Sequence, residues 1–173
     1  ISIASLCGIA NPIRASRCLD QYRLKAGVYC RSAESPVPSA YCSFLGQLCE
    51  DALGIESEPV LEALMPLQQA DGGFIDTGTS GLSQTNASCA VLGCIIRASL
   101  AGAPMPDRIV SKAVDYVASM QSTDGGFKAH AQAPTTDLLS TFTAMSILAV
   151  LGQTERLDLR CHARWIGPLA GED

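Results

Sequence analysis

The sequence is poor in charged residues, aromatic residues and histidines, and these shortages exclude several classes of function. Charged residues make up 17% of the 173 residues and leave a net charge of −5, whereas nucleic-acid binding normally requires a basic surface. We therefore expect no nucleic-acid partner. No stretch reaches the roughly 18 consecutive apolar residues of a membrane-spanning helix, so we expect no membrane span. Hydrophobic residues still make up 47% of the chain, which indicates a folded protein with a buried core.

Metal-binding and disulfide patterns are also missing, although the chain has eight cysteines and two histidines. There is no Cys-x-x-Cys pair, and Cys42 and Cys49 lie too far apart along one helix to form a disulfide. The adjacent Cys161 and His162 supply at most half of a zinc site. We therefore expect most cysteines to be small, buried, reduced core residues, which favours a cytoplasmic location. We expect no metal ion and no other cofactor.

Basic residues gather in one stretch near the N-terminus. They are diluted by Asp20 and by apolar neighbours, so we interpret the stretch as the solvated face of a helix rather than as an anion site. The residues are Arg14, Arg17, Arg23, Lys25 and Arg31.

An internal repeat is the strongest pattern in the chain. The segment from Gln68 to Phe74, Gln-Gln-Ala-Asp-Gly-Gly-Phe, recurs from Gln121 to Phe127 as Gln-Ser-Thr-Asp-Gly-Gly-Phe. A weaker copy is Gly27-Val28-Tyr29. Each copy precedes an apolar run that ends at a glycine, where a helix C-terminus favours glycine. These glycines are Gly54, Gly102 and Gly152. The pattern predicts one domain of helix–loop–helix units over about 14–54, 58–102 and 106–152, followed by a C-terminal tail over 153–173.

The two helices of a unit differ in polarity. From Ile109 to Met120, apolar residues recur at helical spacing with polar residues on the other side, which predicts a half-exposed outer helix. Residues 138–151 carry no charge and are apolar on nearly every side, which predicts an inner helix surrounded by protein. In the loops, paired glycines allow positive φ, and the aspartates can accept hydrogen bonds from loop amides. The phenylalanines can fill the hydrophobic seam below.

These motifs resemble the repeats of the protein prenyltransferase β-subunit and squalene/oxidosqualene cyclase superfamily. The most similar stretch runs from Met120 to Gly152 and follows the pattern Q-x-x-D-G-G-F … D-x-x-x-T … A-x-x-x-L-x-x-L-G. The resemblance implies an all-α fold of the α/α toroid type, in which inner helices line an apolar cavity for an isoprenoid chain. A chain of 173 residues supplies about three helix pairs, so we expect a half or incomplete toroid.

The resemblance does not extend to the catalytic motifs of the superfamily. Protein prenyltransferases hold zinc with an Asp-x-Cys pair and a later histidine; here Asp158 is wrongly spaced from Cys161 and His162. Class II cyclases use an Asp-x-Asp-Asp motif, which this sequence lacks. A diphosphate pocket requires clustered basic residues, and Arg97 alone lies on an expected inner helix. A zinc enzyme built from Asp158, Cys161 and His162 is therefore the least favoured alternative.

The expected function is that of a prenyltransferase-like binding or scaffold module. Its concave apolar face would take a hydrophobic ligand, such as an isoprenoid or a lipid, or a protein partner. An exposed apolar face also predicts a homo-oligomer or a partner protein that covers it. The alternative is an enzyme, a transferase of the prenyltransferase or terpene cyclase type completed by dimerisation or by sequence missing from this fragment. The sequence assigns no catalytic residue and no metal ligand. The candidate ligand-binding residues, for which core packing is the competing interpretation, are Tyr41, Asn86, Cys89, Thr141 and Phe142.

Overall fold

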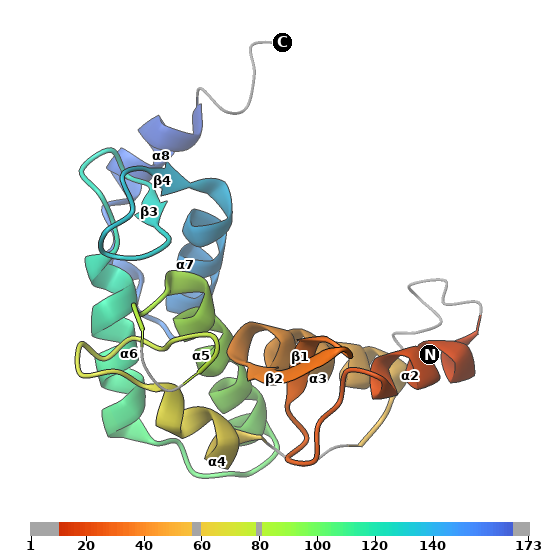
Figure 1. Cartoon of the computed structure of the whole chain (residues 1–173). Coiled ribbons are helices and arrows are strands. Elements are labelled where there is room, and N and C mark those ends of the chain that lie inside the picture. The colour runs from red at the N-terminus through yellow and green to blue at the C-terminus, as the bar shows by residue number, and fades with distance from the viewer. Residues whose placement is uncertain (1–10, 57–59, 79–80, 168–173) are drawn as a thin grey trace.

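The computed structural model describes residues 11–56, 60–78 and 81–167, and these residues form a mostly helical fold (Figure 1). Their α-helices are α2 (Pro12–Asp20), α3 (Ala40–Leu53), α4 (Leu61–Leu64), α5 (Thr85–Leu100), α6 (Asp107–Ser119), α7 (Leu138–Val150) and α8 (Leu159–Ile166). The 3-10 helices η1 (Met65–Leu67) and η2 (Thr154–Arg156) follow α4 and α7. Within the described residues, no helix is long and apolar enough to cross a membrane.

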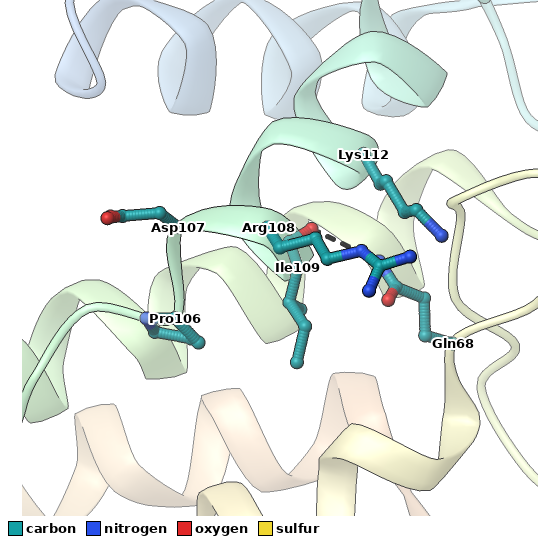
Figure 2. A pocket seen from close by; sticks show the side chains of 6 residues that line it. All are labelled: Gln68, Pro106, Asp107, Arg108, Ile109 and Lys112. Carbon is teal, nitrogen blue, oxygen red and sulfur yellow. Dashed lines mark hydrogen bonds between the residues drawn. The ribbon is translucent and has the colours of Figure 1, made fainter.

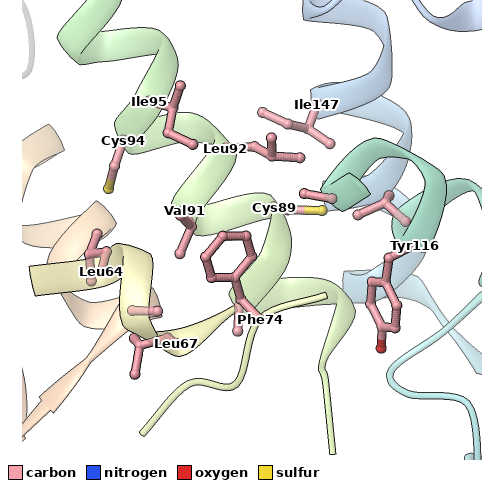
Figure 3. Close-up of a cluster of buried hydrophobic side chains, with 14 of the residues drawn as sticks. Leu64, Leu67, Phe74, Cys89, Val91, Leu92, Cys94, Ile95, Tyr116 and Ile147 are labelled. Carbon is pink, nitrogen blue, oxygen red and sulfur yellow. The ribbon is translucent and has the colours of Figure 1, made fainter. Parts of the chain in front are cut away.

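Helix α5 lies at the centre of the fold and packs against α3 on one side and α7 on the other. Helices α4 and α6 also pack against it. The sequence of α5 explains this position, because Arg97 is its only charged residue and its buried residues cover most of its circumference. Figure 3 shows Val91, Leu92 and Ile95 of α5 in the main hydrophobic cluster, beside Phe74 from the preceding loop. The apolar composition of this run therefore places it as an inner helix.

The predicted loop repeat has the same backbone geometry in all three copies. The amide of Tyr29, Phe74 or Phe127 donates a hydrogen bond to a hydroxyl of the following inner helix. The acceptors are Ser43 Oγ at 3.0 Å, Ser88 Oγ at 2.8 Å and Thr141 Oγ1 at 2.8 Å, respectively. The weak first copy is thus a structural repeat, although it lacks the aspartate and the second glycine.

The roles predicted for the loop residues are confirmed. Asp71 Oδ1 accepts a hydrogen bond from the Gly73 amide at 3.0 Å, and Asp124 Oδ1 accepts one from the Gly126 amide at 3.0 Å. Both loop phenylalanines are fully buried. The glycines at the inner-helix ends also adopt positive φ, as predicted: Gly54 at 70°, Gly102 at 97° and Gly152 at 69°.

Each loop is covered by the outer helix that follows in the chain. Gln68 Nε2 donates to the carbonyl of Gly72 at 2.9 Å and to that of Ile109, in α6, at 3.1 Å. Gln121 Oε1 accepts a hydrogen bond from the amide of Asp158, the N-cap of α8, at 3.2 Å. The loop glutamine therefore connects one unit to the next. Residues 153–167, expected to be a tail, hold η2 and α8, which packs on the third loop.

The expected all-α fold is confirmed as a mostly helical fold, but the described residues also contain two short antiparallel ribbons. Strands β1 (Tyr29–Ser32) and β2 (Ser35–Ser39) pair antiparallel, as do β3 (Phe127–Lys128) and β4 (Thr136–Asp137). Both ribbons continue a loop copy into the start of an inner helix. They form because the chain reverses direction between the loop and that helix.

The basic stretch is more than a solvated helix face. Arg23 Nη2 lies 3.4 Å from Glu50 Oε1, and Arg31 Nη2 lies 2.7 Å from Asp76 Oδ2. Both acids are buried, with 1% and 4% of their surface exposed. Buried carboxylates require such partners, so these two arginines hold α3 and the second loop in place.

The cysteine prediction holds only in part. All seven cysteines within the described residues are free, but only Cys30, Cys89 and Cys94 are buried. Cys18 and Cys49 are exposed, because they lie where α2 and α3 border an open apolar hollow.

The expectation that the third inner helix is surrounded by protein is wrong for the described part of the chain. Leu139, Phe142 and Val150 of α7 are 50%, 66% and 68% exposed. Helix α7 has α5 on one side, whereas among the described elements no inner helix packs on its other side.

Candidate ligand groove

An apolar groove of about 340 Å³ runs across the three inner helices. Helix α3 forms one wall, α7 forms the other, and α5 forms the floor between them. No charged side chain lines this groove. The lining residues are Tyr41, Phe44, Leu48, Asn86, Cys89, Ala90, Phe142, Thr143, Ser146, Ile147 and Val150.

The α3 wall is positioned by a buried carboxylate at the start of that helix. Asp76 Oδ1 accepts hydrogen bonds from Ser39 Oγ and from the Tyr41 amide, both at 2.8 Å. Ser39 is also the N-cap of α3 and accepts from the Cys42 amide at 3.1 Å. These bonds fix the first turn of α3, so the position of Tyr41 at the groove depends on Asp76.

The floor of the groove is made of small residues. Cys89 and Ala90 are 6% and 2% exposed, so their short side chains leave a depression between bulkier neighbours. Gly93, one turn further along α5, leaves room for the ring of Phe44. Burial raises the pKa of the Cys89 thiol to about 12, so this thiol is protonated and unreactive at neutral pH.

One polar pair crosses the groove between α5 and α7. Thr143 Oγ1 donates to Asn86 Oδ1 at 2.7 Å. The amide nitrogen of Asn86 is then left as a donor beside the apolar walls. The groove can therefore hold an apolar molecule and offer a hydrogen bond to a single polar group on it.

The structure brings four of the five candidate residues together in this groove: Tyr41, Asn86, Cys89 and Phe142. Thr141 lies elsewhere, with 1% of its surface exposed. Its hydroxyl is used internally, because it accepts from the Phe127 amide and donates to the Asp137 carbonyl at 2.7 Å.

Sequence reasoning missed the lining residues further along the inner helices. Phe44 and Leu48 follow Tyr41 at helical spacing, and Ser146 and Val150 follow Phe142 in the same way. Extending the helical spacing from the first candidate on each helix would have identified them.

A second hollow, of about 520 Å³, lies at the start of α6 and has a different character. Figure 2 shows Arg108 and Lys112 of α6 beside Gln68, whose amide is bonded to the Ile109 carbonyl. Gln68 connects two units here, and the lining also carries the charged side chains of Asp107, Arg108 and Lys112, which do not suit an apolar ligand. The groove over α5 is therefore the better candidate for a ligand.

Comparison with known proteins identifies the family. The family model described as the prenyltransferase alpha-alpha toroid domain matches residues 18–168. This match covers the three loop copies and reaches past α8. The chain belongs to the prenyltransferase alpha-alpha toroid family. A search of the curated proteins finds none that matches the chain.

The least favoured alternative, a zinc site made of Asp158, Cys161 and His162, does not fit the contacts that these residues make. Among the described residues, no three His, Cys, Asp or Glu side chains are grouped so that they could hold a metal ion. Asp158 Oδ1 caps α8 by accepting hydrogen bonds from the Arg160 and Cys161 amides, at 3.1 and 3.0 Å. These bonds hold the pKa of that carboxyl below its usual range. His162 Nδ1 faces the Gly125 carbonyl at 3.4 Å. These residues are used to dock α8.

Proposed function

We propose that this chain is a hydrophobic-ligand-binding module of the prenyltransferase toroid family, and that the groove over α5 is its ligand site. The observation that supports the proposal most strongly is the uncharged, apolar lining contributed by three inner helices. We infer that these helices belong to about three helix pairs of an incomplete toroid. The groove would then correspond to part of the toroid's inner surface.

The size and polarity of the groove favour an isoprenoid-like ligand. Its volume of about 340 Å³ lies at the lower end of the roughly 300–1,000 Å³ typical of small-molecule sites. Burial of one methylene contributes about 0.8 kcal/mol, which corresponds to about fourfold in affinity. A methyl-branched apolar chain can lie along the floor, and a terminal hydroxyl can bond with Asn86. A diphosphate would find no cation in the groove lining.

A competition titration tests this proposal. The dye 1-anilinonaphthalene-8-sulfonate would first be bound to the chain. Geraniol, farnesol and farnesyl diphosphate would then be added in turn, and the fall in dye fluorescence would report its displacement. We expect farnesol to bind at least tenfold more tightly than geraniol, because more apolar surface is buried, and farnesyl diphosphate to bind more weakly than farnesol. Binding of the diphosphate alone, or of none of these compounds, would contradict the proposal.

A matched pair of variants on α7 locates the site. Ser146 is exposed and lines the groove, whereas Ala149 is exposed on the same helix and is not part of the lining. Ser146→Trp should fill the groove and lower farnesol affinity at least tenfold. Ala149→Trp adds the same ring to the same helix and should leave that affinity within twofold. Equal effects of the two variants would place the ligand outside the groove.

A further inference from the structure

The floor of the groove is shorter than its walls. Positions on the three inner helices can be compared by counting from the hydroxyl that accepts the loop amide in each unit. These hydroxyls belong to Ser43, Ser88 and Thr141. Counted in this way, Leu48 of α3 and Ser146 of α7 both correspond to Gly93 of α5. Both wall residues line the groove, whereas the floor on the fully described α5 ends at Ala90. The walls therefore continue past the end of the floor.

The ring of Phe44 takes the place of the missing floor. A Cβ added to Gly93 would overlap the ring at Cε2 and would lie 2.9 and 3.0 Å from Cδ2 and Cζ. One edge of the ring thus rests against the backbone of α5. Phe44 is itself only partly buried and lines the groove with the rest of its surface. The groove is therefore deep from Asn86 to Ala90 and shallow where the ring covers Gly93.

The glycine at this position is explained by the ring and not by the backbone. Gly93 lies in the interior of α5 (Thr85–Leu100), and it is not among the glycines of positive φ. Glycine destabilises a helix interior relative to alanine, so its presence here requires another reason. The close approach of Phe44 supplies that reason, because no larger residue leaves space for the ring edge.

An ion pair closes the seam between α3 and α5 beyond the ring. Arg97 lies one turn after Gly93, and Asp51 lies one turn after Leu48. Arg97 Nε donates to both carboxylate oxygens of Asp51, at 3.1 and 2.9 Å, and Nη2 donates to Oδ1 at 2.7 Å. Removal of the ring would therefore lengthen the floor by the three residues from Ala90 to Gly93, about 4.5 Å, and by little more.

We propose that Phe44, seated on Gly93, sets the greatest length of apolar chain that the groove binds. This inference rests on the proposed ligand site and adds the residues that determine its specificity. The ligand class is then an apolar chain no longer than that of farnesol. The end of a longer chain would pass over the ring and stay in contact with water, so its added methylenes would contribute little to affinity.

The preference between farnesol and geranylgeraniol, which has one further isoprene unit, tests the proposal. Both compounds would displace the bound dye, and the natural chain should bind them within threefold of each other. Phe44→Ala should bind geranylgeraniol at least tenfold more tightly than farnesol, because each newly buried methylene contributes about fourfold. Phe44→Leu keeps an apolar side chain in the same place and should shift the preference at least threefold. Leu45→Ala is the matched control, because Leu45 is exposed on the same helix outside the lining and should leave the preference unchanged.

The reciprocal variant adds a methyl group beneath the ring. Gly93→Ala should push the Phe44 ring into the groove and weaken farnesol binding at least tenfold. The same substitution made in Phe44→Ala meets no ring, so it should change farnesol affinity by less than threefold. A general loss of stability in α5 would weaken binding in both backgrounds, whereas the proposed contact weakens it only when the ring is present.

The outcomes separate this inference from the ligand site on which it rests. A shift towards geranylgeraniol in Phe44→Ala and Phe44→Leu, with rescue of Gly93→Ala by Phe44→Ala, would support it. Farnesol binding by the natural chain with an unchanged preference in both Phe44 variants would overturn this inference alone. A natural chain that already binds geranylgeraniol tenfold more tightly than farnesol would also overturn it. Absence of farnesol binding by the natural chain would overturn the proposed ligand site and this inference together.

Discussion

The substitution Thr141→Val tests whether this residue is structural or binds ligand. Thr141 was a candidate ligand residue on sequence grounds, but its hydroxyl connects the Phe127 amide to the Asp137 carbonyl inside the protein. Valine has nearly the same shape and lacks the hydroxyl. The variant therefore removes two hydrogen bonds without creating a large cavity.

The expected cost follows from burial. Thr141 is 1% exposed and Phe127 is fully buried, so water cannot replace the lost acceptor. A buried amide without a partner costs about 1–3 kcal/mol. In a domain of this size, each kcal/mol corresponds to about 2–4 °C in the melting temperature. We therefore expect Thr141→Val to lower the melting temperature by about 2–12 °C.

Thermal and urea unfolding, both followed by circular dichroism, together with farnesol titration, provide the assay. Thr141→Ser is the control, because serine performs the same role at Ser43 and Ser88. Serine should restore most of the lost stability, and farnesol affinity should stay within twofold in both variants. The structural role would be refuted if Thr141→Val left the free energy of unfolding unchanged and weakened farnesol binding.

Two further predictions concern backbone packing and alkaline pH. Gly72→Ala should cost about 2–5 kcal/mol, because it combines a positive φ of 90° with a Cβ only 2.5 Å from the Lys112 carbonyl oxygen. Gly102→Ala has a φ of 97° but open space around the added Cβ, so thermal unfolding should show a loss of only about 1–2 kcal/mol; equal losses would contradict this reasoning. Burial raises the pKa of Cys89 and Cys94 from 9.0 to about 12. Their contribution to stability is thus complete below pH 9 and is lost as the pH rises towards 12, at up to about 1.4 kcal/mol per pH unit for each thiol. Urea midpoints between pH 8 and 11 should fall less steeply in Cys94→Ala, and an unchanged slope would argue against this cause.

The loop geometry could be predicted from sequence because it depends on local chemistry. An aspartate two residues before a glycine amide, and a glycine that takes positive φ, determine most of the turn. Even the first copy, with only Gly27 retained, keeps a positive φ of 73° at that position. The nearly uncharged composition of the run around Leu92 similarly indicates an inner helix, although the same reasoning overestimates the burial of α7. The residue pattern alone therefore predicts the order of outer and inner helices.

The groove could be predicted from sequence only in part, because its lining depends on which residues of different helices meet in the folded protein. The hydroxyls of Thr141 and Thr143 are two residues apart on one apolar helix, and nothing in the sequence separates their roles. One is turned towards its own loop and the other towards Asn86 on α5. The pairing of Arg31 with Asp76 likewise joins residues far apart in sequence. Such contacts depend on tertiary packing and leave no local pattern.

The docking of α8 shows a different reason why sequence reasoning failed at residues 153–167. The loop glycines Gly72 and Gly125 are conspicuous in the sequence, but each meets a backbone carbonyl rather than a side chain. Any residue can supply that carbonyl. Lys112 of α6 therefore meets Gly72, and Cys161 of α8 meets Gly125, although their side chains are unlike. The ring that packs on the second glycine of each loop also differs: Tyr116 packs on Gly73, and Trp165 packs on Gly126. A glycine required by close backbone approach therefore predicts that a neighbour exists, and only the structure shows that this neighbour is the outer helix of the next unit.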